Sequence, residues 1–176
     1  MRLLLVYPYV PYPLNRGTYH RVFNLARELA RHHETDLFCL ASPEARDHLA
    51  VFTAFCERVR FHPFENPPWQ RLFPNRLLNS MPASIAHWSQ SNVFPALRQF
   101  AAGRDYDLIH FCDLVMWQYV RQIAGRALRV MDRSRVDLLF QKEELNVLNL
   151  DAKARLLRRE NLWKLAQYER AAVRSL

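Results

Sequence analysis

The feature that most constrains this chain is the alternation of short apolar runs with segments of helical spacing. The first run, RLLLVY at 2–7, ends directly before Pro8, a pattern typical of a strand buried on both faces of a parallel sheet. Four more strands are predicted, at 35–41, 58–64, 106–112 and 127–132. Helical segments separate these runs, and that order predicts an α/β protein with a Rossmann-like parallel sheet flanked by helices.

The predicted helices are marked by apolar stripes and by capping residues. After the first loop the stripe comprises Val22, Leu25, Ala26, Leu29 and Ala30. Thr18 is the expected N-cap of that helix. Further helices are predicted at 43–56, 93–102, 114–124 and from 136 onward. The last is expected to break near 149–151, where Asp151 can cap a new helix. The apolar stripe of that new helix comprises Leu162, Leu165, Ala166, Ala172 and Val173.

Composition limits the classes of protein to which this chain can belong. Its residues are half apolar, which suits a single domain with a buried core over 1–176. No apolar run approaches the roughly 20 residues of a membrane span. Cys39, Cys56 and Cys112 are far apart and lack metal-ligand spacing, so we expect reduced thiols, no metal site and a cytoplasmic location.

The positive charge is unevenly distributed. The net charge is +8, and residues 121–176 carry +6 of it. Such a region can meet phosphate, nucleic acid or the anionic inner face of a membrane, although basic helices with solvated faces give the same charge. No nucleic-acid-binding motif is visible, so nucleic acid is not an expected partner.

A segment in the middle of the chain is rich in aromatic and basic residues. These residues are Trp69, Phe73, Trp88 and Phe94 with Arg71, Arg76 and Arg98. One interpretation is a surface for a sugar-lipid acceptor or a membrane interface. The alternative is a long connector that packs its aromatic side chains inward.

Three loops should carry any ligand site, because ligands of parallel sheets bind beyond the carboxyl ends of the strands. They are predicted at 8–21, 110–115 and 132–138. In the first, Gly17 opens a helix whose dipole favours an anion, and Arg16 and Arg21 add positive charge. A single glycine excludes the dinucleotide fingerprint, and ordinary turn chemistry is the alternative.

The other two loops supply an imidazole and a carboxylate. His110 closes the fourth strand, with Asp113 just beyond it, and could orient a hydroxyl or act as an acid or base. Asp132 closes the fifth strand, where it could accept bonds from sugar hydroxyls, and Arg135 could meet a phosphate. The alternatives are a structural histidine, and helix capping by Asp132.

Taken in order, these segments resemble glycosyltransferase family 4, in particular bacterial sugar transferases linked to exopolysaccharide. The resemblance rests on four segments that together follow the order of the family. They are MRLLLVYPYVPYPLNRGTYHRVFNLARELARHHETDLFCLA at the start, YDLIHFCDLVMWQYV around the fourth strand, RVMDRSRVDLLF around the fifth, and ARLLRRENLWKLAQYERAAVRSL, which resembles the helix before the sixth strand. It implies the N-terminal, acceptor-side half of a GT-B enzyme. Such an enzyme retains anomeric configuration, uses no metal or cofactor, and moves a sugar from a nucleotide-sugar to a glycan or lipid-linked acceptor.

The resemblance also implies roles for individual residues. His110 and Asp132 match the catalytic positions, and Gly17 and Thr18 match the turn that approaches the donor diphosphate. Two positions depart from the pattern: many members have a second glycine where this chain has Thr18, and an acidic residue or histidine where it has Arg135.

The donor domain, with its paired-glutamate segment, is expected after a sixth strand that would follow Leu176. We therefore expect negligible transferase activity from residues 1–176 alone, and a homodimer could cover the exposed sheet edge. The alternative functions are a non-catalytic module that binds an anionic ligand or a membrane surface, and another α/β enzyme that is complete in itself.

Overall fold

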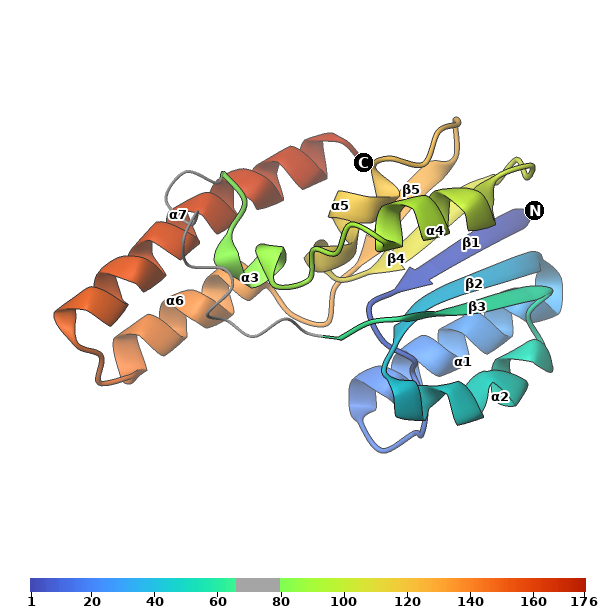
Figure 1. The fold of residues 1–176 in the computed structure, drawn as a ribbon, viewed down its shortest axis with the longest axis horizontal. Coiled ribbons are helices and arrows are strands. Elements are labelled where there is room, and N and C mark those ends of the chain that lie inside the picture. The colour runs from blue at the N-terminus through green and yellow to red at the C-terminus, as the bar shows by residue number, and fades with distance from the viewer. Residues whose placement is uncertain (66–79) are drawn as a thin grey trace. The chain divides into compact units, whose positions relative to one another are not determined.

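The computed structural model describes residues 1–65 and 80–176, and its elements follow the predicted alternation (Figure 1). Within the described residues, the strands are β1 (Arg2–Tyr7), β2 (Glu34–Ala41), β3 (Arg58–Pro63), β4 (Leu108–Cys112) and β5 (Leu128–Asp132). All of their pairings are parallel, in the order β3-β2-β1-β4-β5. The predicted α/β class with a Rossmann-like parallel sheet is therefore confirmed.

The chain divides into two compact units. The sheet unit comprises residues 1–65 and 90–132, and the helical unit comprises 66–89 and 133–176, of which 80–89 and 133–176 are described. The sequence predicts a single domain over residues 1–176, and the division into two compact units does not test that prediction.

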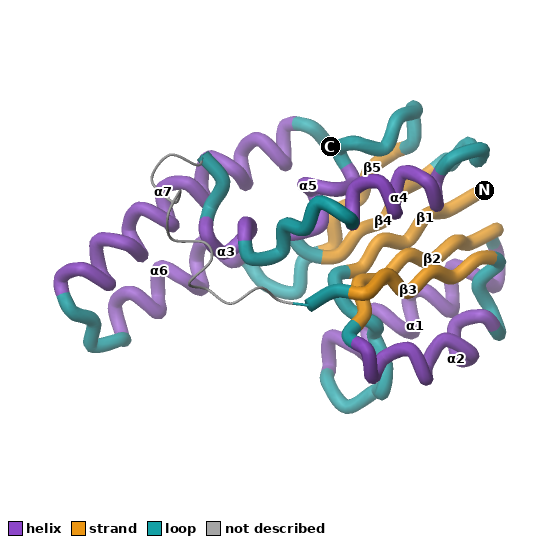
Figure 2. Tube along the Cα trace, in the orientation of Figure 1, coloured by secondary structure: helices purple, strands orange, loops and turns teal. Residues whose placement is uncertain are grey.

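Helices cover both faces of the sheet in the sheet unit. The α-helices are α1 (Gly17–His32), α2 (Leu49–Thr53), α4 (Val93–Ala101) and α5 (Trp117–Val120). Two 3₁₀ segments precede α2 and α5, namely η1 (Pro43–His48) and η3 (Leu114–Met116). Figure 2 shows α1 and α2 on one face of the sheet, with α4 and α5 on the other. This arrangement is what a parallel sheet buried on both faces requires.

Several predicted helix boundaries were wrong. The helix expected over 43–56 begins as the 3₁₀ segment η1, with Pro43 in its first turn. The helix expected over 114–124 ends at Val120, and the chain then turns toward β5 through Gly125, whose φ is 123°. Glycine adopts a positive φ of this kind at little steric cost, so Gly125 permits the turn that leads into β5.

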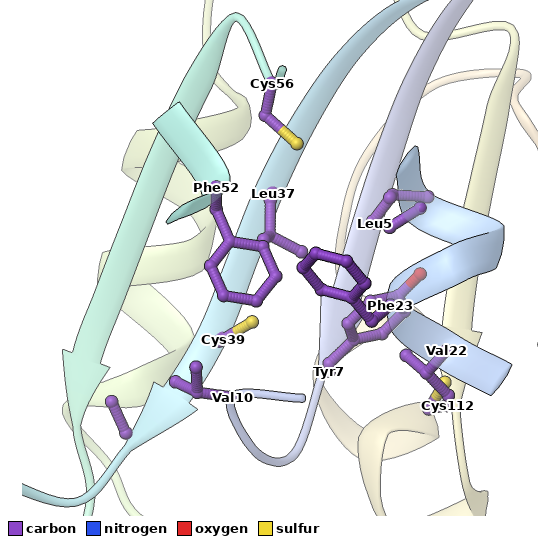
Figure 3. Close-up of a cluster of buried hydrophobic side chains, with 12 residues drawn as sticks. Leu5, Tyr7, Val10, Val22, Phe23, Leu37, Cys39, Phe52, Cys56 and Cys112 are labelled. Atoms are coloured by element: carbon purple, nitrogen blue, oxygen red, sulfur yellow. The ribbon is translucent and has the colours of Figure 1, made fainter. Parts of the chain in front are cut away.

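The core on the α1 face brings together residues that are distant in sequence (Figure 3). Leu5 of β1 and Leu37 of β2 pair in register, and both are fully buried there. Phe23 of α1 meets Phe52 of α2 edge-on, with ring centroids 5.6 Å apart. Of the predicted α1 stripe, Val22 and Ala26 are buried and the other members are partly buried, whereas buried Phe23 was not predicted.

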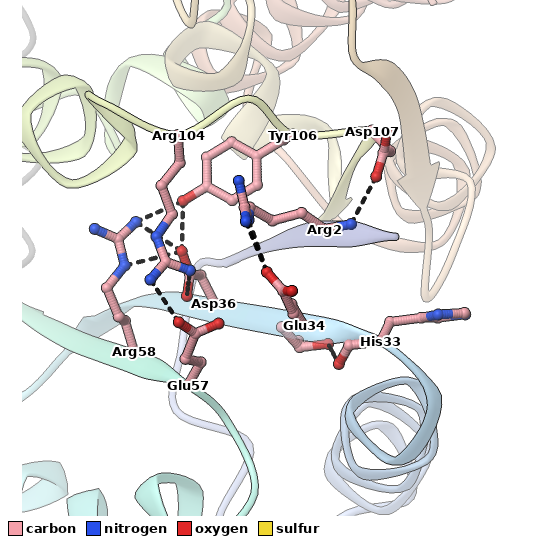
Figure 4. Close-up of polar contacts among 10 residues, drawn as sticks. Arg2, His33, Glu34, Asp36, Glu57, Arg58, Arg104, Tyr106 and Asp107 are labelled. Carbon is pink, nitrogen blue, oxygen red and sulfur yellow. Dashed lines mark hydrogen bonds and ion pairs between the residues drawn. The ribbon is translucent and has the colours of Figure 1, made fainter.

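One charged side chain lies fully buried in the sheet (Figure 4). Asp36 of β2 accepts hydrogen bonds from Arg58 Nε at 2.9 Å and Nη2 at 2.6 Å, and from the Tyr106 hydroxyl at 2.6 Å. Arg104 lies 3.4 Å from its other oxygen and also pairs with Glu57. A buried carboxylate is costly unless it is paired and hydrogen-bonded, and these partners provide that compensation.

The helical unit contains α3 (Ala83–Ala86), α6 (Asp137–Val147) and α7 (Ala152–Arg174) within its described part. The predicted break near 149–151 is confirmed, because the Asp151 carboxylate accepts a hydrogen bond from the Ala154 N–H at 2.6 Å and caps α7. The later stripe is only partly right: Leu165 and Ala172 are buried, but Val173 is 57% exposed. Packing against α6 and α3 selects a different face of α7 from the one that spacing alone suggested.

Candidate functional site

The predicted loops 8–21 and 110–115 leave the sheet from neighbouring strands. β1 pairs with β2 on one side and with β4 on the other, so the strand order reverses at β1. The segment after β1 leads into α1 on one face, and the segment after β4 leads into α5 on the opposite face (Figure 2). Parallel sheets bind their ligands at such a switch in strand order, because the diverging loops leave room there.

The end of β5 is tied to α1 by an ion pair. A single nitrogen of Arg21, Nη1, lies 2.6 Å from Oδ1 of Asp132 and 2.5 Å from Oδ2. The Arg21 side chain is 46% exposed and that of Asp132 is 16% exposed. The hydrogen bond to Asp132 raises the pKa of Arg21. The structure therefore brings together two predicted site residues that are far apart in sequence.

His110 lies beside this pair. Its Nε2 is 3.9 Å from Oδ2 of Asp132, close enough for electrostatic attraction but too long for a direct hydrogen bond. Its Nδ1 is 3.4 Å from the hydroxyl of Tyr7, whose ring meets the imidazole edge-on. The two residues predicted as catalytic are thus neighbours, and Tyr7 is a third member that sequence reasoning missed. The only sequence signal for it was its position at the end of the first strand.

Burial sets the protonation states of this group. It lowers the pKa of His110, an effect that the nearby Asp132 opposes and Arg21 reinforces. It also raises the pKa of Tyr7, so the phenol keeps its proton. Because the phenol keeps its proton, the Tyr7 hydroxyl can donate to Nδ1 of His110. In that tautomer the imidazole proton lies on Nε2 and faces the Asp132 carboxylate.

The backbone after β4 adopts a conformation that side chains rarely take. Asp113 has φ 64° and ψ 152°, and its N–H donates to the backbone oxygen of Asp132 at 2.7 Å. Non-glycine residues in this region cost on the order of 1–3 kcal/mol and cluster at functional sites. Burial also raises the pKa of the neighbouring Cys112 thiol, so this thiol keeps its proton.

The first turn of α1 differs from the prediction in its cap. The helix begins at Gly17 with Arg16 at the N-cap position, so Thr18 lies inside the first turn and is not the cap. No cap side chain bonds the first amides, and the first turn holds no acidic residue. A Cβ at Gly17 would meet nothing within 4 Å, so the space beside this turn is open. This helix start is therefore open to an anion, and the anion site expected at Gly17 stays a prediction.

Aromatic rings flank the same loop. Tyr9 and Tyr19 stack with centroids 5.0 Å apart, and the Arg16 guanidinium lies 5.5 Å from the Tyr19 ring centroid. The predicted Arg16 is thus held beside an aromatic pair that was not predicted. Such a surface suits a ligand that combines apolar and charged groups.

Arg135 belongs to the helical unit. Its Nε donates to Asp137 at 2.9 Å, and its guanidinium lies 4.2 Å from the Phe140 ring centroid. The nearby Arg133 pairs with Glu169 and, at 3.5 Å, with Asp137. Both arginines are therefore engaged within this unit.

The aromatic and basic segment is only partly described, because Trp69, Arg71, Phe73 and Arg76 lie outside the described residues. Phe94 packs on Tyr119 with ring centroids 4.7 Å apart, and Trp88 is half-buried. Arg98 is exposed. The Phe94 ring therefore packs against the protein, as the inward-packing connector would have it.

The described ranges, 1–65 and 80–176, contain neither a cluster of potential metal ligands nor a helix that could span a membrane. Those residues include no group of three or more histidine, cysteine, aspartate or glutamate side chains that could hold a metal ion. Among their helices, none combines the length and the apolar character needed to cross a membrane. The three cysteines are free and buried.

Comparisons of the chain with protein-family models, with curated proteins and with solved structures found no match.

Proposed function

We propose that residues 1–176 form the acceptor-side half of a retaining glycosyltransferase that moves a sugar from a nucleotide-sugar to a glycan or lipid-linked acceptor. The observation that carries the proposal is the group formed by Asp132, His110 and Arg21 at the carboxyl edge of the parallel sheet, beside the switch in strand order. His110 and Asp132 are the positions that the family 4 resemblance implies to be catalytic, and Arg21 was expected from its positive charge in the first loop.

Asp132 is the acceptor-binding group in this proposal. Its carboxylate is partly exposed and can exchange one Arg21 contact for the hydroxyls of a sugar. In the tautomer with its proton on Nε2, the imidazole of His110 faces the Asp132 carboxylate across 3.9 Å, and the Tyr7 hydroxyl contacts Nδ1 on the other side of the ring. His110 therefore acts first as a positioning residue, and a proton leaving an acceptor hydroxyl would pass to the Asp132 carboxylate.

The donor diphosphate would approach the start of α1. Three features favour an anion there: the uncapped backbone N–H groups of the first turn, the open space at Gly17 and the Arg16 guanidinium. In this proposal the remaining donor contacts come from a second Rossmann-like domain, as the resemblance implies. Residues 1–176 alone are then expected to bind acceptor and to transfer no sugar.

An acceptor-binding experiment tests the proposal. The ¹⁵N-labelled protein is titrated with a panel of glycans and short-chain lipid-linked sugars, and with nucleotide-sugars, and amide shifts are followed. We expect one acceptor class to shift the signals around Arg21 and Asp132, and Asp132→Asn to weaken its binding about tenfold. Glu34→Gln is the matched control, because Glu34 pairs with Arg2 at the opposite, amino edge of the sheet.

Two results would contradict the proposal. One is the absence of any acceptor-dependent shift at the carboxyl edge across the panel. The other is sugar transfer by the purified chain, because it would show a complete enzyme rather than half of one.

A second candidate function is docking on an anionic membrane surface, and one face of α7 favours it. Leu156 and Trp163 lie two turns apart on this face and are 68% and 65% exposed. The surrounding exposed residues are Lys153, Arg159, Arg170 and Arg174. Apolar and aromatic side chains among basic ones are typical of helices that lie at a membrane interface.

Liposome co-sedimentation separates the two candidates. Binding to vesicles with anionic lipid that falls with added salt, and that is lost in Trp163→Ala, supports docking. Equal binding to neutral vesicles, or unchanged binding by Trp163→Ala, would contradict membrane docking. Ala171→Ser on the same helix is a control that leaves Trp163 and the basic side chains unchanged.

A further inference from the structure

The helical unit contains a pocket that the proposed function does not use. Its volume is about 580 Å³, within the range of small-ligand sites. Its lining comes from the start of α3, from Arg135 in the segment before α6, and from α6 and α7. All of its lining residues belong to the helical unit, and none is a member of the carboxyl-edge group.

Two arginines line this pocket, and each is held in place by one carboxylate. Arg135 uses Nε for its 2.9 Å bond to Asp137, and Arg158 uses Nη1 for its 3.0 Å bond to Glu144. Within the described residues, the two terminal nitrogens of Arg135 have no hydrogen-bond partner, and neither do Nε and Nη2 of Arg158. Each guanidinium can therefore still offer charge-assisted hydrogen bonds to an anion.

The pocket is also preorganised by a buried amide. Asn161 of α7 is only 8% exposed, and its Nδ2 donates to Gln141 Oε1 of α6 at 2.8 Å. Its Oδ1 accepts from the Ser84 N–H at 3.3 Å, so one side chain joins three segments of the unit. With Gln141 oriented through its oxygen, its Nε2 has no partner among the described side chains and can donate to a ligand.

The remaining lining fits a sugar ring. Phe140 and Leu157 supply apolar surface for its C–H groups, while the Ser84 hydroxyl and the Gln141 amide can bond its hydroxyls. The carboxylate of Glu144 has one oxygen outside the Arg158 bond and can accept from a further hydroxyl. Two arginines against one glutamate leave the lining net positive.

We infer that this pocket binds a small sugar that carries one anionic group, either a phosphate or a carboxylate. The anion lies between Arg135 and Arg158, and the ring contacts Phe140, Leu157 and the two polar side chains from α3 and α6. This site goes beyond the proposed function and does not depend on it, because its residues belong to the helical unit alone.

The test uses the ¹⁵N-labelled full chain and the side-chain amide signals of Gln141 and Asn161. Glucose 6-phosphate, glucuronate, glucose and inorganic phosphate are titrated separately at millimolar concentrations. We expect saturable shifts of both signals with one of the two anionic sugars or with both, and weaker effects from glucose and from inorganic phosphate. The response to glucose 6-phosphate against glucuronate shows which anion is preferred.

Variants then assign the binding to the pocket. Arg135→Gln and Arg158→Gln should each weaken it about tenfold, because each removes charge-assisted hydrogen bonds. Arg155→Gln is the matched control: it lies on α7, is exposed, and does not line the pocket. Circular dichroism confirms the fold of each variant.

Three outcomes would overturn the inference. The two amide signals could stay unchanged with every probe. The arginine variants could bind as the wild type does. Inorganic phosphate could bind as tightly as the anionic sugars, which would leave no role for the sugar ring. None of these results bears on acceptor binding at the carboxyl edge, so the two proposals fail separately.

Discussion

Nη1 of Arg21, in α1, contacts both carboxylate oxygens of Asp132, the last residue of β5, at 2.6 and 2.5 Å. One nitrogen shared between two oxygens is a weaker arrangement than a two-nitrogen fork, because the two N–H bonds of one Nη diverge and cannot both point straight at the oxygens of one carboxylate. A ligand can therefore displace one contact without breaking the pair. This geometry suits a carboxylate that is held in position and can still accept a hydrogen bond from a ligand.

The Arg21–Asp132 pair should contribute only modestly to stability. Arg21 is 46% exposed, so solvent screens the pair, and we expect a coupling free energy of about 0.5–1 kcal/mol. A double-mutant cycle of Arg21→Gln and Asp132→Asn, followed by urea unfolding, measures it. The Arg2–Glu34 pair is the control and should show smaller coupling, because both of its members are exposed. Coupling above about 2 kcal/mol would show a structural rather than a ligand-binding pair.

The pH dependence of stability should reflect His110. Burial lowers its pKa in the folded protein, so at pH values below the ordinary value of 6.5 the unfolded chain binds the proton more readily. Stability is then full above pH 6.5 and falls as the pH drops toward the lower folded pKa. Urea unfolding at several pH values should show a shallower decline for His110→Gln.

An NMR titration provides the independent measurement for His110. Its imidazole signal should have a midpoint below 6.5. The pKa of His62 and of His87 is also lowered by burial, so both contribute to the decline and should remain in the His110→Gln variant. A midpoint for His110 at or above 6.5 would contradict the prediction.

Removing the Asp36 carboxylate should destabilise the protein strongly. Asp36→Ala leaves Arg58 and Tyr106 without their buried partner (Figure 4), which typically costs about 3–5 kcal/mol. Glu57→Gln is the control, because Glu57 is exposed and, among the described residues, forms its ion pair with Arg104 alone, so its loss should cost less than about 1 kcal/mol. Thermal unfolding measures both, and similar values for the two variants would show that the buried network is not stabilising.

The strained backbone at Asp113 gives a matched comparison. Asp113→Gly and Asp113→Ala both remove the carboxylate, but only glycine adopts φ 64° and ψ 152° at little steric cost. The glycine variant should therefore be more stable than the alanine variant by about 1 kcal/mol or more, as measured by urea unfolding. Equal stability would mean that the loop relaxes when the side chain changes.

Much of the fold follows from sequence patterns, because apolar periodicity and helix capping both reflect the geometry of a few neighbouring residues. The five strands were predicted to within about two residues, since their apolar runs and alternation reflect burial on a sheet. The cap at Asp151 is equally local, because it joins a side chain to an N–H three residues away. The stripe on α7 was less accurate, since the buried face depends on which helices pack against it.

The carboxyl-edge group was predicted only as separate residues. His110, Asp132 and Arg21 each follow from their place at a strand end or a helix start. Their mutual distances do not, because strand order decides which ends become neighbours. The role of Tyr7 could not be predicted, because the sequence indicates only a core tyrosine at the end of a buried strand. The structure shows that its hydroxyl lies 3.4 Å from Nδ1 of His110.

The sequence by itself determined the alternation of strands and helices, and therefore the parallel α/β fold and the edge of the sheet that carries the candidate site. Tertiary structure alone decided the rest: the contact of Arg21 with Asp132, the burial of Asp36 and the pocket that includes Arg135. The physical reason is the separation in sequence over which each kind of interaction acts. Periodicity and capping act over a few residues, whereas these contacts join side chains that only strand order and helix packing bring together.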